Sequence, residues 1–271
     1  MTVGNAQGKP VVRAAKSRKE LRHEQIMSVL EANPTLRVNQ LAEALGVSAE
    51  TVRRDLTELD QIGRLNRTYG GAVSTANRFE PALNERLSLF ISERRAIARL
   101  AVQRYAGEEA LLLGGGATMV QFARTLREVR HRLTVVTPAY PVAAELAANP
   151  LIEVMVLPGV FEQQEGIVCG PETVRALDRF RAPVALIGAS GLNVEGVSEA
   201  MLGAAEVYSA ILRTADRSVV LADHSKFGKR ALTLLTGWTP RLSVITNKAP
   251  EPTLLSALAD AGAAIDIAPS D

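Results

Sequence analysis

The sequence contains very little cysteine, and Cys169 is the one thiol among its 271 residues. An internal disulfide and a thiolate-rich zinc site are therefore excluded, and a reducing compartment suits the chain. The sequence also lacks any apolar run near the roughly 18 residues of a membrane helix, and its N-terminus lacks the apolar segment of a signal peptide. We therefore expect a soluble, cytoplasmic protein with no membrane partner, no metal and no cofactor.

Charge is scarce overall but unevenly distributed, with a net charge of +2. Residues 1–78 carry 12 Lys and Arg against 8 Asp and Glu, whereas residues 79–271 carry 19 against 21. At 271 residues and 47% hydrophobic content, the chain suits two domains of ordinary globular composition. The positively charged part coincides with the motif described next.

Two short helical patterns surround a turn at Gly46-Val47-Ser48. Each pattern has one apolar face, formed by Leu41, Ala42 and Leu45 in the first helix and by Val52, Leu56 and Leu59 in the second. Ser48 is suited to cap the second helix, and Glu50 in the first turn complements the helix dipole. The arrangement predicts a helix-turn-helix.

The residues after the second helix, 62–71, alternate apolar and basic side chains before a glycine pair, which predicts a hairpin wing. In a winged helix-turn-helix the N-terminal turns of the second helix enter the major groove of DNA. We expect DNA contacts from Ser48, Thr51, Arg53, Arg54, Arg64, Arg67 and Tyr69. Of the two adjacent arginines, one reads guanine while the other holds phosphate, or Asp55 orients one of them. The alternative is a head used only for protein contacts.

The expected organisation has four parts. Residues 1–16 form a disordered basic arm, and residues 17–74 form the winged helix-turn-helix, which begins with a bracing helix over about residues 17–32. That first helix turns Leu21, Ile26, Val29 and Leu30 inward. Residues 75–106 form a helical connector with one long helix from Glu80 to Tyr105, and residues 107–271 form a second domain.

Short apolar strands alternate with helices throughout the second domain. The expected strands are Ala110–Leu113, Leu133–Val136, Ile152–Leu157, Val184–Ile187, Val219–Ala222, Leu242–Thr246 and Ala263–Ile267. The expected helices are Thr118–Val129, Pro141–Ala148, Glu199–Thr214 and Pro252–Ala261. This alternation predicts an α/β domain with a mainly parallel sheet, in which ligands bind beyond the carboxyl ends of the strands.

Three loops follow these strands and carry candidate chemistry. The glycine-rich loop from Gly114 to Thr118 opens a helix, so its backbone amides could hold an anion, or it is simply a tight turn. A dinucleotide site is excluded because Met119 stands where that motif needs its third glycine. The loop from Gly188 to Gly191 is no nucleophile elbow, since Leu192 replaces the last glycine. The third loop, 223–228, brings a carboxylate, an imidazole and an ammonium to a strand end.

Two groups of motifs resemble the deoxyribonucleoside-regulator (DeoR) family of bacterial repressors. In the first domain they are V-S-A-E-T-V-R-R-D-L and G-R-L-N-R-T-Y-G-G-A, and in the second they include the glycine-rich loop and A-D-H-S-K-F-G from Ala222 to Gly228. The resemblance implies a sensor domain related to ribose-5-phosphate isomerase that recognises phosphorylated sugars or related metabolites. The expected effector contacts are Gly114, Gly115, Gly116, Ala117, Thr118, Thr137, Gly188, Ser190, Asp223 and Lys226.

The sequence departs from the family pattern where hydroxyl-binding groups are usual. Gly114 replaces an acid, Ala117 replaces a hydroxyl residue, and Pro138 and Met201 also differ. Because each buried sugar hydroxyl without a partner costs on the order of 1–3 kcal/mol, we hypothesise an effector that is atypical, less hydroxylated or differently posed, or a loss of sensing.

These features predict a DNA-binding repressor that a small metabolite releases from its operator, acting as a homo-oligomer, either a dimer or a tetramer. An activator of the same family is the alternative. An isomerase is a further alternative, but the loop Ser190-Gly191-Leu192-Asn193 lacks the carboxylate base that such enzymes keep there. We therefore expect no enzymatic activity.

Overall fold

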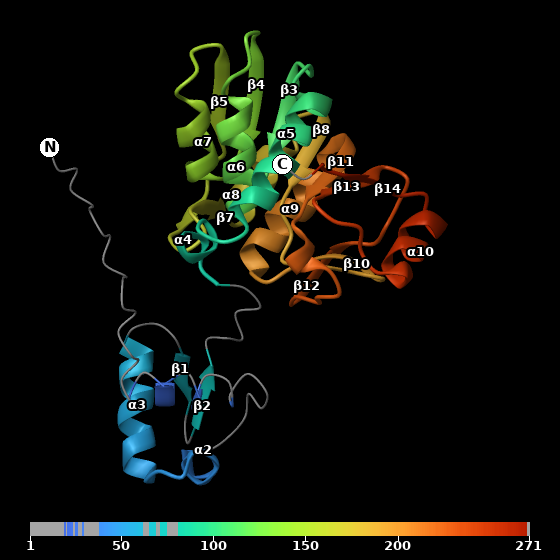
Figure 1. Cartoon of the computed structure of the whole chain (residues 1–271). Coiled ribbons are helices and arrows are strands. Elements are labelled where there is room, and N and C mark those ends of the chain that lie inside the picture. Colours follow the sequence, from blue (N-terminus) through green and yellow to red (C-terminus); the bar gives the residue numbers. More distant parts are fainter. Residues whose placement is uncertain are drawn as a thin grey trace, which may run out of the picture. The chain divides into compact units, whose positions relative to one another are not determined.

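The computed structural model describes residues 19, 21–23, 25–26, 29, 38–61, 65–68, 71–74 and 81–269. The chain divides into two compact units, Met1–Asn77 and Arg78–Asp271, which are described separately (Figure 1). The expected basic arm lies outside the described residues. Among the residues described, no helix has both the length and the apolar character needed to cross a membrane.

The first unit contains the predicted pair of helices, α2 (Val38–Leu45) and α3 (Ala49–Gln61). Their apolar faces meet helical residues around Ile26, and the buried core consists of Ile26, Leu41, Ala42, Val52, Leu56 and Leu59. The helix-turn-helix prediction is therefore confirmed. One detail of the first helix was wrong, because Leu21 is exposed.

The predicted wing is an antiparallel hairpin of β1 (Leu65–Thr68) and β2 (Gly71–Ser74). In its register Leu65 lies opposite Ser74 and Thr68 lies opposite Gly71. Two residues therefore connect the strands, the loop length typical of a tight hairpin.

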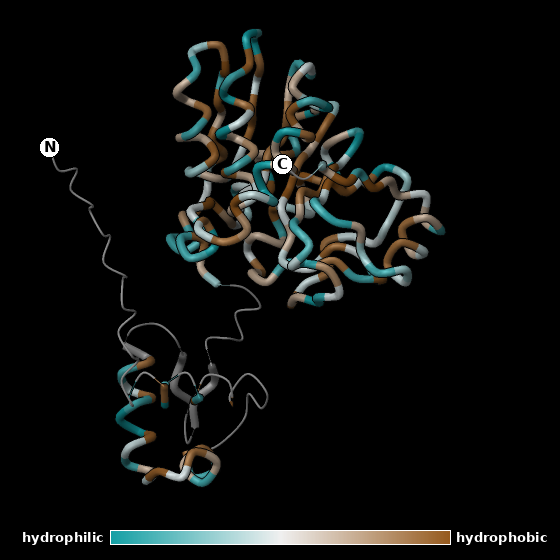
Figure 2. The backbone as a smooth tube through the Cα atoms, in the orientation of Figure 1, coloured by the Kyte–Doolittle hydropathy of each residue, from teal (hydrophilic) through white to brown (hydrophobic). Residues whose placement is uncertain are grey.

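The second unit is built on a seven-stranded sheet with the order β14-β13-β11-β8-β3-β4-β5, in which every neighbouring pair is parallel. Its strands are β3 (Ala110–Leu113), β4 (Leu133–Thr137), β5 (Ile152–Val156), β8 (Ala182–Ile187), β11 (Ala215–Leu221), β13 (Leu242–Thr246) and β14 (Ala264–Ile267). All seven predicted strands are confirmed, two of them, β3 and β13, with the predicted bounds and the other five with shifted ends. Their apolar runs form the hydrophobic core, which Figure 2 shows in brown along the strands.

The helices of the second unit follow the strands as predicted. They are α6 (Ala117–Leu126), α7 (Tyr140–Leu146), α8 (Pro171–Leu177), α9 (Leu202–Thr214) and α10 (Pro252–Asp260). Helix α6 packs against α7, and α8 packs against α9. Helix α8 was not predicted.

Five short strands and one short helix supplement the main sheet and were also not predicted. A hairpin forms from β6 (Val160–Glu162) and β7 (Ile167–Cys169), and an antiparallel sheet has the order β12-β10-β9. That sheet consists of β9 (Gly191–Asn193), β10 (Gly196–Glu199) and β12 (Thr233–Thr236), and the 3-10 helix η2 spans His224–Lys226.

The expected single connector helix is two helices, α4 (Leu83–Arg86) and α5 (Ile91–Tyr105). The break occurs at Phe90, which has a left-handed backbone with φ of 51°. Helix α5 packs against α6, and its Ala96, Ile97, Ala98 and Ala101 are buried in the core of the second unit. Both helices lie in the second unit.

Candidate functional site

The turn between α2 and α3 sets the start of the exposed second helix. The amide of Gly46 donates to the Glu43 carbonyl at 3.3 Å, and the amide of Val47 donates to the Ala42 carbonyl at 3.1 Å. With φ of +63° at Gly46, this is a Schellman ending of α2. The chain then enters α3 at Ser48, whose Oγ accepts the amide hydrogen of Thr51 at 3.1 Å.

The arginines that sequence analysis assigned to DNA contact lie on the exposed side of α3. The Arg53 side chain is 53% exposed and pairs with Glu50 at 3.3 Å, and Arg54 is also exposed. Ser48 is exposed and Thr51 is half-buried, with their hydroxyl oxygens 2.8 Å apart. Because Val52 and Leu56 on the same helix are buried, α3 presents its cationic side chains away from the core.

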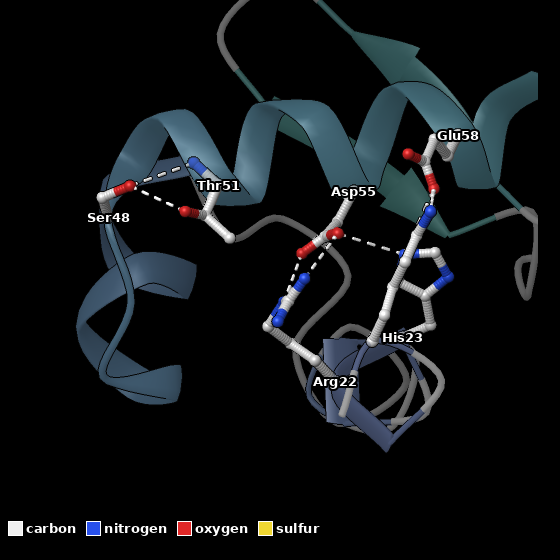
Figure 3. A network of polar contacts seen from close by, with 7 residues as sticks. Arg22, His23, Ser48, Thr51, Asp55 and Glu58 are labelled. Atoms are coloured by element: carbon white, nitrogen blue, oxygen red, sulfur yellow. Dashed lines mark hydrogen bonds and ion pairs between the residues drawn. The ribbon is translucent and has the colours of Figure 1, made fainter. Parts of the chain in front are cut away.

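Asp55 pairs with residues of the first helix, on the buried side of α3, and does not orient Arg53 or Arg54. That part of the sequence-based interpretation was wrong. Its carboxylate accepts two hydrogen bonds from Arg22, at 2.5 and 3.0 Å, and lies 3.2 Å from Nε2 of His23 (Figure 3). Burial alone would raise the pKa of Asp55, but these hydrogen bonds outweigh it and hold the pKa below its usual value.

The second set of predicted DNA contacts was assigned to the wing. Arg67 lies in β1 opposite Ala72, whereas Arg64 and Tyr69 lie outside the described residues. Of the three residues assigned to the wing, the structure therefore places the backbone of Arg67 only.

The second unit has a pocket at the carboxyl ends of three neighbouring strands. Gly115 and Gly116 follow β3, Gly188 follows β8, and Lys226 follows β11. The complete lining is Arg86, Arg94, Gly115, Gly116, Ala117, Thr118, Glu165, Gly188, Ala189, Glu199, Ala204, Tyr208 and Lys226. The pocket is thus at the edge where an α/β sheet binds ligands.

Three basic side chains of this lining are buried: Arg86 is 8% exposed, Arg94 is 4% exposed and Lys226 is 7% exposed. Arg86 forms an ion pair with Glu165, and Nε of Arg94 donates to the fully buried Asp223 at 3.1 Å. Cations that stay this deep are paired, as the cost of burying charge requires.

The glycine-rich loop approaches the pocket as the sequence predicted, but one of its amides already has a partner. The amide of Gly115 donates to the hydroxyl oxygen of Tyr208 at 3.0 Å. Burial raises the pKa of that hydroxyl well above its usual value, so it stays protonated at neutral pH. Gly116 has φ of 99° and precedes α6, which has no side-chain cap. The positive end of the α6 dipole therefore points into a basic pocket.

Six of the ten predicted effector contacts line the pocket: Gly115, Gly116, Ala117, Thr118, Gly188 and Lys226. The other four, Gly114, Thr137, Ser190 and Asp223, are buried but do not line the pocket. Ser190 donates to Glu199 at 3.0 Å, and Thr137 accepts the amide hydrogen of Ala139 at 3.1 Å. These side chains support loops of the site.

Sequence reasoning missed the lining residues that come from distant segments, chiefly Arg86, Arg94, Glu165 and Tyr208. Arg94 lies in the segment E-R-R-A-I-A, Glu93 to Ala98, which also resembles the family described in the sequence analysis and is the one signal in the sequence for Arg94. Arg86, Glu165 and Tyr208 lie in segments with no recognisable motif. Their position depends on the tertiary fold.

The carboxylates at the pocket are engaged. Glu199 accepts the amide hydrogens of Ala200 and Met201 at 2.8 and 3.2 Å, as well as the Ser190 hydroxyl, and Glu165 binds Arg86. Within the described residues no cluster of His, Cys, Asp and Glu could hold a metal ion. Burial also raises the pKa of Cys169 to about 11, which leaves an unreactive thiol at neutral pH.

Comparison with known protein families identifies both units. A DeoR-like helix-turn-helix domain matches residues 22–78, and the DeoR C-terminal sensor domain matches residues 90–248. The chain belongs to the DeoR family. It is therefore a DNA-binding transcriptional regulator with an effector-sensing domain, and the resemblance seen in the sequence is confirmed.

Relatives of this DeoR-family chain extend over nearly its whole length. An uncharacterized HTH-type transcriptional regulator of Bacillus subtilis, YulB, is 27% identical over 88% of this chain and 93% of its own. The HTH-type transcriptional repressor CsqR of Escherichia coli is 27% identical over 88% and 92%. The glycerol-3-phosphate regulon repressor of Haemophilus influenzae is 26% identical over 86% and 91%.

Among solved structures, ribose 5-phosphate isomerase A from Neisseria gonorrhoeae is 20% identical and covers 51% of this chain and 53% of its own, with a TM-score of 0.38. Such a score is too low to support an argument. The fold of this DeoR-family protein rests on its own strand order.

Proposed function

We propose that this protein represses carbohydrate or related catabolic genes in the cytoplasm and leaves its operator when a small phosphorylated metabolite binds the pocket. The observation that carries the proposal is the burial of Arg86, Arg94 and Lys226 around the N-terminus of α6. The names of relatives, which include a glycerol-3-phosphate regulon repressor, agree with an anionic effector.

The electrostatics of the pocket favour an anion. Each buried cation is worth more to a ligand there than at the surface, because the surroundings screen charge less than water does. The amides at the start of α6 add hydrogen-bond donors and the positive end of the helix dipole. A phosphate group satisfies both kinds of partner at once.

The rest of the lining offers few partners for a polyhydroxylated ligand. Six of the lining residues are glycines or alanines and have no polar side chain: Gly115, Gly116, Ala117, Gly188, Ala189 and Ala204. Glu165 and Glu199 are already engaged, as described above. We therefore retain the hypothesis of an effector with fewer hydroxyl groups than pentose or hexose phosphates, or one bound in a different pose.

Thermal unfolding with added anions tests the site. Inorganic phosphate, glycerol 3-phosphate, ribose 5-phosphate and glucose 6-phosphate are each added to the full chain and to Lys226→Ala. Lys229→Ala is the matched control, since Lys229 is exposed three residues away and does not line the pocket. We expect the smaller anions to raise the melting temperature of the wild type and the control but not of Lys226→Ala.

Two results would count against the proposal. The absence of stabilisation by any anion would remove the phosphate site. Strong stabilisation by ribose or glucose phosphates, lost in Lys226→Ala, would keep the site but refute the hypothesis of an atypical effector.

We also propose that the protein binds DNA as a homo-oligomer. A single small head buries limited surface on DNA, whereas paired heads read two half-sites and multiply specificity. Analytical ultracentrifugation of the full chain tests this, and a monomer at micromolar concentration with or without DNA would contradict it.

A further inference from the structure

We propose that Arg94 is the residue that couples the pocket to the segment preceding it, the elbow formed by Arg86 to Phe90 between α4 and α5. The inference rests on the proposed anion site and adds a route by which occupancy is transmitted. The elbow matters because it lies near the start of the second unit along the chain, shortly after the DNA-binding head ends in the sequence.

Arg94 holds the elbow by its backbone. Its Nη1 donates to the carbonyl of Leu89 at 2.9 Å and also to the carbonyl of Arg86. These carbonyls lie at the end of α4 and just before α5, so one guanidinium joins both sides of the bend.

The same guanidinium also binds a buried carboxylate next to the pocket loop. Its Nε donates to one oxygen of the buried Asp223 at 3.1 Å, and the other oxygen of Asp223 accepts the amide hydrogen of Ser225 at 3.1 Å. Ser225 lies in η2 directly before Lys226, a lining residue of the pocket. Arg94 therefore connects the elbow to the loop that carries one of the pocket cations.

Phe90 keeps an unfavourable backbone at the bend. Its φ of 51° lies in the left-handed region, which a phenylalanine adopts only where its surroundings hold it. The ring meets the guanidinium of Arg94 at 6.0 Å from its centroid and the ring of His224 edge-on at 5.4 Å. The bend thus depends on Arg94 and on the residue that follows Asp223.

Arg94 can bind a ligand without releasing these partners. The guanidinium lines the pocket, and its Nη2 makes no hydrogen bond with the residues that the structure describes. An anion bound to Nη2 and to Arg86 would add bonds on both sides of the bend. Occupancy of the pocket would then tighten the elbow.

Hydrogen exchange of the full chain, read by mass spectrometry, tests the coupling with inorganic phosphate as the probe. Saturating phosphate should slow exchange of the amides in 86–94 several-fold in the wild type. In Arg94→Lys the charge beside Asp223 remains, but a single ammonium cannot reach the carboxylate and both carbonyls in the same fixed fork. We expect this variant to bind phosphate more weakly and, at saturation, to show no slowing at the elbow.

Arg104→Lys is the matched control. Arg104 lies on the same helix and forms an exposed pair with Asp266 at 3.2 Å, and neither residue lines the pocket. The elbow of this variant should respond to phosphate as the wild type does. A second variant, Phe90→Ala, removes the ring but keeps the backbone strain, so its elbow should exchange faster than that of the wild type before phosphate is added.

The outcomes separate the two proposals. If phosphate does not stabilise the wild type, the anion site fails and the coupling fails with it. If phosphate binds but the elbow exchange is unchanged, only the coupling is overturned. A full response in Arg94→Lys, or unchanged basal exchange in Phe90→Ala, would also overturn it.

Discussion

Asp55 shows how one buried side chain can decide the stability of the small head. Its partners Arg22 and His23 lie more than thirty positions earlier in the chain, so the ion pair fastens the first helix to α3. In Asp55→Asn the Arg22 charge loses its partner, and we expect a loss of about 1–3 kcal/mol in the stability of the head. Circular dichroism of residues 1–77 during thermal unfolding measures this, and a loss within error of zero would show that the pair contributes nothing.

The lowered pKa of Asp55 gives the same pair a pH dependence. A carboxyl whose pKa is lower when folded adds stability above its usual value of 3.8, and this stability is lost as the pH falls through the folded value. The wild-type head should therefore lose more stability than Asp55→Asn when the pH falls from 5 to below about 3. Parallel pH profiles for the two proteins would contradict the assignment.

Substitution of Arg53 and of Arg67 by alanine should weaken DNA binding in different ways. Arg53 lies on the exposed side of α3, so Arg53→Ala should cost about 1–3 kcal/mol of DNA binding and relax the base preference. Arg67→Ala in the wing should weaken binding to all sequences and lower the salt slope by about 1. Fluorescence anisotropy compares a duplex selected from a random pool with an unselected duplex, and equal losses on both duplexes for both variants would contradict these roles.

At the level of elements, the turn of the helix-turn-helix depends on the backbone of Gly46. A side chain there has open space, so the cost of Gly46→Ala comes from the positive φ alone. We expect about 1 kcal/mol of lost stability in the head. Gly107→Ala is the control, because Gly107 also has open space but no left-handed backbone, and it should be neutral or slightly stabilising. Equal effects of the two substitutions on thermal unfolding would contradict this account.

The elements that could be predicted are those whose signal is local. A buried parallel strand such as Ala110–Leu113 is a continuous apolar run, and Ser48 marks the start of α3 by its capping chemistry. Short strands such as β6 and β9 carry three residues each and no distinct pattern. The break at Phe90 was missed because its cause, Arg94 reaching back to the preceding carbonyls, is a contact of the folded chain.

Only part of the pocket lining could be predicted from the sequence. The lining residues that follow the strands could be predicted, because the carboxyl ends of parallel strands lie at the same edge of the sheet. Its buried arginines come from α4 and α5, which the sequence assigned to a connector. A side chain that reaches a site from another segment leaves no periodic signal in the sequence.

For the whole molecule, the two units should divide the function between them. Residues 1–77 alone should bind the selected duplex about tenfold or more weakly than the full chain, because separate heads lose the benefit of linked binding. Phosphate should affect DNA binding of the full chain and not of the isolated head. Equal affinities, measured by anisotropy at the same salt concentration, would contradict the proposed oligomer.

The ion pair behind α3 lies on the opposite side of the helix from its outward face, and that outward face is not part of the buried core. Glu50, Arg53 and Arg54 contribute nothing to the buried core, whereas Val52, Asp55 and Leu56 supply it from the opposite side of the same helix. Substitutions at these three outward positions can therefore change the preferred DNA sequence without changing the buried core. A chimaera that exchanges only those positions with a relative should melt at an unchanged temperature while it selects a different operator.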